Sequence, residues 1–242
     1  MANTSLLQRS GRHRKATKSG ASAEMNSLEV KYKRQMGIFN PLVYGKTSVT
    51  LVGAGGIGSW TALALSKIGL SSVHVYDGDR ISVHNQPAQY FPGWAVGKYK
   101  TDVLEENLDG VVGFNEFVGD SFVGSSLITI AAVDSNTSRR HIWDWALRDY
   151  ACRWYFDGRL GGQTAMLYTV DMESVDQMAR YEETLHSDEE RTVVPCAESA
   201  VIDVAFTIAA MITRGVRLAL TAGESTFQRV VCQRTGSTME VK

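Results

Sequence analysis

The sequence predicts an α/β domain in which a mostly parallel β-sheet is flanked by helices. Two patterns predict this fold class. Apolar runs of strand length alternate with longer, helix-like stretches from residue 28 onward. A glycine-rich turn, GAGGIG at 53–58, joins the first such strand to the first such helix. With 242 residues, of which 44% are hydrophobic, the chain can bury the core of one such domain, which we place at 28–242.

The first half of the domain alternates strands with helices. Gly69 ends the first helix, because glycine readily adopts the left-handed conformation of a helix C-terminus. Thr137 or Ser138 is a suitable N-cap for a later helix. In chain order we expect a strand at 49–53, a helix at 58–67, a strand at 71–77, a helix near 98–107, a strand at 126–134 and a helix at 137–151.

The second half departs from this alternation. Two strands, at 153–158 and 162–171, are joined by the glycine-rich turn DGRLGG and could pair antiparallel in the same sheet. Residues 172–192 are polar and acid-rich, which predicts a loop or excursion. A long, mostly apolar helix follows at 198–220. Because helices separate the earlier strands, we expect ligands at the carboxyl ends of the parallel strands.

Composition narrows the classes of function. The formal net charge of −1 provides no overall field for nucleic acid, and the longest apolar stretches fall short of a bilayer span, so neither nucleic acid nor membrane is expected as a partner. The three cysteines form no Cys-x-x-Cys pair, which argues against a disulfide framework or a thiolate zinc site. No secretory signal opens the chain, so we expect a cytoplasmic protein. Residues 1–27 are basic and poor in apolar side chains, which predicts a flexible tail.

The glycine loop predicts a nucleotide site of the Rossmann type. Gly53 permits a tight turn, Gly55 and Gly56 let a phosphate approach the backbone, and Gly58 allows the helix to pack closely on the strand. Asp77 ends the next strand and is placed to accept hydrogen bonds from ribose hydroxyls. The alternative is a purely structural glycine turn. Nicotinamide-dependent dehydrogenases share every one of these features.

Other polar segments follow the loop in a definite order. The stretch YDGDRISVHNQPAQYF at 76–91 contains two carboxylates, Asp77 and Asp79, followed by Asn85 and Gln89. Lys98 and Lys100 come from VGKYK at 96–100. Asp134 ends the strand in AAVDSNTSRR at 131–140, and Arg34 precedes the domain's first strand in KYKRQMG at 31–37.

In this order the segments resemble the ubiquitin-activating-enzyme-like family, whose bacterial members include ThiF, MoeB and HesA. YKRQ is similar to the family's Tyr-x-Arg-Gln, VGAGGIGS to its glycine loop, and YDGDRISVHNQPAQ to its Asp-x-Asp, Asn and Gln run. VGKYK is similar to its Gly-x-x-Lys, AVDSNTSR to its Asp-Asn and Arg segment, and PCAESAV to a segment that carries a reactive cysteine in some members. The resemblance covers residues 30–220.

The resemblance implies an adenylyltransferase that activates ubiquitin-like modifiers. Such an enzyme uses ATP to adenylate the C-terminal carboxylate of a small ubiquitin-like or sulfur-carrier protein or peptide with a Gly-rich C-terminus. Lys100 and Arg34 would supply positive charge and Asp134 would hold Mg²⁺, with Arg34 reaching the triphosphate from the partner subunit of a homodimer. Cys196 precedes the long helix and would take part in a later transfer to a thiol; the alternative is a buried structural cysteine.

One departure from the family and several alternatives stay open. The family has an arginine before the position of Gln89, where this chain has Ala88, so a cation is missing unless Lys98 or another residue replaces it. The C-terminal Cys-x-x-Cys zinc ribbon of the family is absent as well. Lys100 could be a solvated lysine, Arg34 a surface ion pair and Asp134 only a helix cap. At the level of function, the alternatives are a catalytically impaired nucleotide-binding scaffold and a nicotinamide-dependent oxidoreductase.

Overall fold

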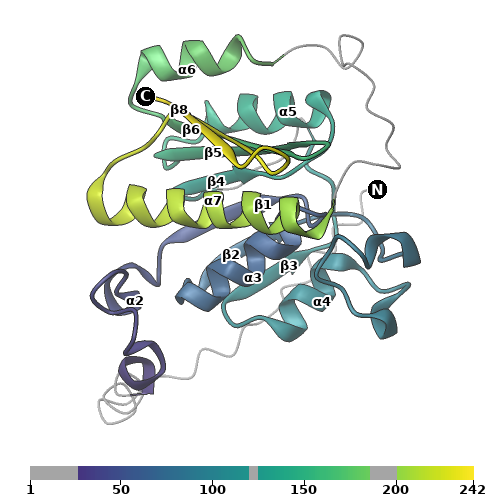
Figure 1. Ribbon diagram of the computed structural model, residues 1–242. Coiled ribbons are helices and arrows are strands. Elements are labelled where there is room, and N and C mark those ends of the chain that lie inside the picture. Colours follow the sequence, from purple (N-terminus) through teal and green to yellow (C-terminus); the bar gives the residue numbers. More distant parts are fainter. Residues whose placement is uncertain (1–26, 120–124, 186–200) are drawn as a thin grey trace, which may run out of the picture.

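The protein was studied as a computed structural model, which describes residues 27–119, 125–185 and 201–242 (Figure 1). Nearly all of the predicted tail at 1–27 and all but the last residue of the PCAESAV segment, including Cys196, lie outside the described residues. The domain boundary and the role of Cys196 therefore stay predictions.

The strands of the described residues form one eight-stranded sheet in the order β3-β2-β1-β4-β5-β6-β7-β8. The first five strands in this order run parallel, and β5 to β8 pair antiparallel. The strand bounds are β1 Ser48–Val52, β2 Ser72–Tyr76, β3 Val111–Phe114, β4 Ile128–Ala131, β5 Trp154–Gly161, β6 Thr164–Asp171, β7 Gln228–Cys232 and β8 Ser237–Val241. This arrangement confirms the predicted α/β class, including the antiparallel pairing of the later strands.

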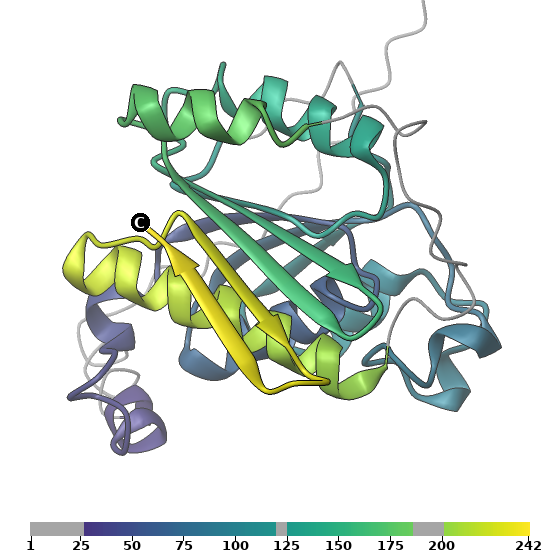
Figure 2. The ribbon, with the colours of Figure 1, turned by 45° about the horizontal axis from the view of Figure 1, so that its top comes forward.

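Helices cover both faces of the sheet. In Figures 1 and 2, α5 and α6 lie on one face, and α3 and α7 lie on the other, while the β7–β8 hairpin extends the sheet at its edge. Two short 3₁₀ turns, η1 Val83–Asn85 and η2 Gly93–Ala95, lie between β2 and α4. The helix bounds are α2 Pro41–Tyr44, α3 Gly58–Ile68, α4 Lys100–Asn107, α5 Asn136–Ala146, α6 Val175–Glu182 and α7 Ile202–Ala222.

The core consists of one apolar cluster on each face of the sheet. Alternating residues of the parallel strands, such as Leu51 and Ile130, pack with α3, α4 and α7 on one face. On the other face α5 and α6 contribute Trp143 and Tyr181, both fully buried. Because both faces are covered, the parallel strands are almost entirely apolar, which is why they could be found from the sequence.

Three details differ from the sequence-based expectations. Residues 172–192 contain a helix, α6, whose amphipathic pattern is short and interrupted by acids. The strands β3, β7 and β8 were not expected, because they are short and only partly buried. The N-cap of α5 is Ser135, whose hydroxyl accepts the Ser138 N–H at 3.0 Å, and not Thr137 or Ser138.

The length of α7 corrects one further expectation. By length and composition alone this helix could cross a membrane, so the apolar stretches do reach a bilayer span. In the structure α7 packs against α3, β5 and β6 and buries Ile208, Ile212 and Val216 completely. Core helices pass the same test of length and composition, so the span is weak evidence for a membrane.

Candidate functional site

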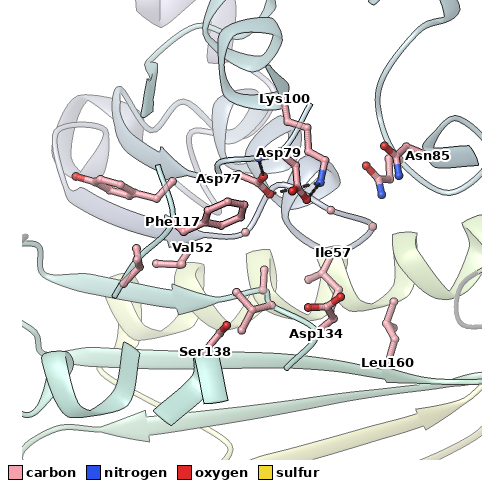
Figure 3. A pocket seen from close by; sticks show the side chains of 18 of the residues that line it. Val52, Ile57, Asp77, Asp79, Asn85, Lys100, Phe117, Asp134, Ser138 and Leu160 are labelled. Carbon is pink, nitrogen blue, oxygen red and sulfur yellow. Dashed lines mark hydrogen bonds and ion pairs between the residues drawn. The ribbon is translucent and has the colours of Figure 1, made fainter. Parts of the chain in front are cut away.

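A cavity of about 550 Å³ lies outside the carboxyl ends of the parallel strands. After β1 the chain continues to β2 and β3 on one side of β1, whereas β4 and β5 lie on its other side. The strand order therefore reverses between β1 and β4. Ligands of open α/β sheets bind at such a point, because the loops diverge there and leave a crevice. The lining comes from the glycine loop, the end of β2, residues 84–89, the start of α4, residues 117–118, the β4–α5 turn and the end of β5 (Figure 3).

The glycine loop brings open backbone to the cavity. Gly53 has φ +95° and lies so close to Ala132 that a side chain there would meet the Ala132 carbonyl. A Cβ on Gly58 would overlap the carbonyl oxygen of Gly53, so Gly58 serves packing and does not line the cavity. Gly55 and Gly56 line the cavity, and a Cβ on Gly55 would meet open space.

The N-terminus of α3 is suited to an anion. Its N-cap is Ile57, and no side chain among the described residues caps it. The N–H groups of a first helical turn need acceptors, and the helix dipole favours negative charge at this end. The N-termini of α4 and α5 reach the same cavity through Lys100 and Ser138. A phosphate chain would therefore meet backbone donors and positive dipole ends here.

The two carboxylates after β2 have different environments. Asp77 is buried, its Oδ2 accepts the N–H of Ala54 at 2.7 Å, and its Oδ1 accepts the N–H of Asp79 at 2.8 Å. It thus fastens the glycine loop to the end of β2. The side chain of Asp79 is 55% exposed and lines the cavity. Asp79 is therefore the more accessible acceptor for a ribose, whereas the sequence pointed first to Asp77.

Lys100 is a buried, paired lysine and not a solvated one. Its side chain is 6% exposed, and its Nζ lies 2.7 Å from Asp79 Oδ2 and 3.6 Å from Asp77 Oδ2. The backbone helps to place it, because its N–H donates to the carbonyl of Asp79. Figure 3 shows this lysine and the two aspartates meeting over the glycine loop.

The segment 84–89 contributes amides to the cavity. Asn85 Oδ1 accepts hydrogen bonds from the backbone N–H and the hydroxyl of Ser82, which anchors η1. Gln89 Oε1 is buried without a hydrogen-bond partner in the described part of the chain, so this oxygen is available to a donor. Ala88 also lines the cavity, and its carbonyl accepts the indole N–H of Trp60.

Lys98 does not replace the missing cation at position 88. It is absent from the cavity lining, its Nζ lies 3.3 Å from Glu106 Oε2, and it sits over the ring of Trp94. Among the described lining residues, the fixed cations are Lys100 and Arg139.

Asp134 has the properties of a ligand for a hydrated divalent cation. It lines the cavity and is exposed, and Ser135 caps α5 in its place, so the alternative of a helix cap is wrong. No group of three or more acidic, histidine or cysteine residues that could hold a metal is found within the described ranges. Mg²⁺ is commonly held by one or two carboxylates together with substrate phosphates, and Asp134 fits that role.

Arg139 is a cavity residue that the site prediction left out, although the segment AVDSNTSR contains it. It lies on the first turn of α5, is only 4% exposed, and donates from Nε to Asp157 Oδ1 at 2.9 Å. Its other nitrogens donate to Asn136 Oδ1 and to the Val133 carbonyl. Its partner Asp157 lies on β5, 18 residues away, and nothing local in the sequence signals this pairing.

Arg34 is not brought to the cavity of its own chain. It is exposed, and the neighbouring Gln35 donates to the carbonyl of Ile68, the last residue of α3. Arg34 therefore lies near the C-terminal end of α3, whereas the glycine loop precedes the N-terminal end. An eleven-residue helix separates the two.

The other end of the cavity is apolar. Val52, Val118, Val133 and Ile142 line it and belong to one apolar cluster, and the exposed side chain of Phe117 also lines the cavity (Figure 3). A planar base fits such a wall, because flat rings bury apolar area against aliphatic and aromatic side chains. The cavity thus offers an apolar wall as well as polar and charged side chains.

Comparison with known proteins identifies relatives of the chain. The model of the ThiF family matches residues 42–240. The ubiquitin-like modifier-activating enzyme 5 of Oryza sativa subsp. japonica is 34% identical over 64 residues, which are 26% of this chain and 15% of that protein. The match thus spans less than a fifth of the length of this curated relative.

Solved structures share the fold. PaaA is 20% identical with a TM-score of 0.66, over 98% of this chain and 78% of that one. E. coli MccB, solved with AMPCPP and MccA, is 16% identical with a TM-score of 0.69, over 93% of this chain and 78% of that one. A further structure of E. coli MccB with ATP has a TM-score of 0.68 at 15% identity, over 93% and 78% of the two chains. At these identities the likeness concerns the fold.

Proposed function

Because the chain belongs to the ThiF family, we propose that it is an ATP-dependent adenylyltransferase. Its substrate in this proposal is the C-terminal carboxylate of a small ubiquitin-like or sulfur-carrier protein, or of a peptide. One observation carries the proposal: a single cavity brings together the glycine loop, Asp79, Lys100 and Asp134, which come from four separate segments. The same class of substrates is supported by the MccB structures with ATP and with the peptide MccA, and by the name of the rice relative, which activates ubiquitin-like modifiers.

The chemistry suits a site without a general base. A C-terminal carboxyl group has a pKa of about 3.5 and is ionised at neutral pH. One carboxylate oxygen forms a bond to the α-phosphorus of ATP, the bond from that phosphorus to the bridging oxygen of the β-phosphate breaks, and pyrophosphate leaves with the electron pair. Both reactants are anions, so the site must supply positive charge and position.

The residues of the cavity divide this work. The N–H groups at the start of α3 bind the phosphate chain, and the apolar end beside Phe117 receives the base. Lys100, held by Asp77 and Asp79, supplies a fixed positive charge close to the ribose and phosphates. Mg²⁺, held by Asp134 and the phosphates, would neutralise part of the triphosphate charge.

We further propose a homodimer in which Arg34 acts on the partner subunit's nucleotide. In its own chain this residue lies at the opposite end of α3 from the glycine loop. A partner subunit could bring it to the triphosphate, where the cavity lacks a cation at Ala88. A later transfer of the acyl group to a thiol such as Cys196 remains a part of the proposal that rests on the family resemblance. A cytoplasmic location remains a proposal that rests on the sequence alone.

Two measurements test the proposed function. Calorimetric titration should give micromolar binding of ATP with Mg²⁺ and much weaker binding of NADH, and tighter binding of NADH would identify an oxidoreductase instead. Exchange of labelled pyrophosphate into ATP should appear when a cognate carrier protein or peptide is added. If ATP binds but no small protein or peptide encoded beside this chain produces exchange, the chain is a nucleotide-binding scaffold and the enzymatic proposal is wrong.

A further inference from the structure

A buried charge cluster lies behind the cavity wall, between α5 and β5; its residues Asp157 and Arg159 belong to the DGRLGG segment, which was expected to be a turn but continues β5 as far as Gly161. Asp157 is completely buried, and two arginines share its carboxylate: Arg139 Nε lies 2.9 Å from Oδ1, and Arg159 Nε lies 2.6 Å from Oδ2. Arg139 lines the cavity, whereas Arg159 does not. Arg159 is instead held between the backbone and hydroxyl of Thr184 and the rings of Tyr168 and Tyr181.

The cluster carries an uncompensated positive charge. Within the described residues, neither arginine has a second carboxylate partner. The neighbouring Tyr155 and Tyr181 stay neutral, because burial raises the pKa of both phenols above the ordinary value, and Tyr181 donates its hydroxyl proton to Asp157. Two guanidinium groups therefore share the single negative charge of a completely buried carboxylate.

Such an arrangement is costly unless an anion lies nearby, because an isolated charge is poorly solvated inside a protein. Asp157 alone would neutralise Arg139, and the pair would attract phosphate weakly. Because Arg159 also pairs with Asp157, the carboxylate neutralises Arg139 only in part, and Arg139 keeps an excess of positive charge toward the cavity. Three of the five N–H groups of Arg139 donate to protein acceptors in the described chain, so two remain for a ligand.

We propose that Arg159 is a positioning residue that acts through Asp157 and Arg139 to keep the cavity wall positive toward the phosphates of the bound nucleotide. This inference rests on the proposed function, since it assumes that a nucleotide occupies the cavity. It also accounts for Ala88, which stands where the family has an arginine. The positive charge then comes from Arg159 behind the cavity wall and not from the segment that contains Ala88.

The test measures the affinity of the whole protein for three ligands by calorimetry at low ionic strength. The ligands are AMPCPP in the presence of Mg²⁺, AMP, and adenosine. A unit charge about 10 Å from a phosphate, at an effective dielectric constant of about 20, changes affinity by about tenfold. Arg159→Gln should therefore weaken AMPCPP by about tenfold, AMP less, and adenosine not at all. Arg159→Lys should bind like the wild type. The matched control is Arg153→Gln, which removes a cation at the other end of β5 that pairs with Asp171 and Glu173, and should change nothing.

A second comparison separates charge from structure. Asp157→Asn combined with Arg159→Gln leaves Arg139 as the cluster's single charge, so AMPCPP affinity should return toward the wild-type value. If Arg159→Gln alone does not fold, this double variant is compared with Asp157→Asn, which has one more positive charge and should bind AMPCPP about tenfold more tightly. Unchanged AMPCPP affinity in Arg159→Gln, or an equal loss for adenosine, overturns the inference. Failure of the wild type to bind AMPCPP overturns the proposed function itself.

Discussion

Replacing each of the two aspartates after β2 by alanine should separate loop support from nucleotide binding. Asp77 accepts backbone N–H groups at 2.7 and 2.8 Å and lies 3.6 Å from Lys100 Nζ, all in a buried environment. Hydrogen bonds to a charged group contribute about 1.5–3 kcal/mol each. Asp77→Ala should therefore lower the free energy of unfolding by about 3–5 kcal/mol, because it leaves one buried and one partly buried N–H group without an acceptor and a less well paired lysine.

Asp79→Ala should behave in the opposite way. The carboxylate is more than half exposed, although its loss leaves Lys100 with Asp77 at 3.6 Å. The free energy of unfolding should therefore fall by about 1–2 kcal/mol, less than for Asp77→Ala. If Asp79 accepts a ribose hydroxyl, ATP affinity should fall by about ten- to a hundredfold.

The assays are urea denaturation and calorimetric titration with ATP and 2′,3′-dideoxy-ATP. The wild type should prefer ATP, and Asp79→Ala should bind the two nucleotides equally, since the missing hydroxyls then have no partner to lose. The assignment is wrong if Asp79→Ala still discriminates between them as the wild type does. It is also wrong if Asp77→Ala unfolds at the wild-type urea concentration, because Asp77 would then not be fastening the loop.

Substitutions at other positions, and the reactivity of two cysteines, give further testable predictions. Asp134→Asn should abolish the increase in ATP affinity that Mg²⁺ produces in titrations, without lowering the melting temperature, because the side chain is exposed and caps no helix; a large loss of stability would contradict this role. Ser135→Ala should reduce the free energy of unfolding by about 1 kcal/mol in urea, since it removes the N-cap of α5. Arg34→Ala mixed with Asp134→Ala should recover pyrophosphate exchange through heterodimers, and no recovery would mean that Arg34 does not act across an interface. In timed alkylation followed by mass spectrometry, Cys232 should react before Cys152, because hydrogen bonding to Thr235 lowers the pKa of Cys232 whereas burial raises that of Cys152 to about 11; faster labelling of Cys152 would refute this order.

The architecture could be predicted where the chain's own periodicity decides it. The strands β1, β2 and β4 are buried on both faces, so their apolar runs stand out from the polar segments around them. The glycine loop and Gly69 could be placed because backbone conformations with positive φ favour glycine. Asp134, just before α5, was found as a polar residue at a predicted strand end, whereas Lys100, the first residue of α4, was found through the order of motifs that resembles the family.

Elements whose formation depends on a neighbour could not be predicted. The strand β7 is half-buried and β8 is mostly exposed, and both exist because β6 offers a free edge for pairing. The helix α6 has few apolar residues, and Tyr181 anchors it by packing against Trp143 and Tyr155 from distant parts of the chain. The helix or strand propensity of a segment does not indicate such partners, because they lie in distant parts of the chain.

The sequence alone determined the order of the site's parts, because glycine geometry and strand periodicity are local properties of the chain. It also predicted that Asp77 and Asp134 would lie at one edge of the sheet, since parallel strands bring their carboxyl ends together, whereas Lys100 was added to this site through the family resemblance. The tertiary structure decided how these groups divide their work. Asp77 is buried and its hydrogen bonds hold the glycine loop, whereas Asp79 is exposed to the cavity and available to a ligand. The pairing of two arginines with Asp157 arises only when α5 packs on β5, because electrostatic partners are chosen by distance in space and not along the chain.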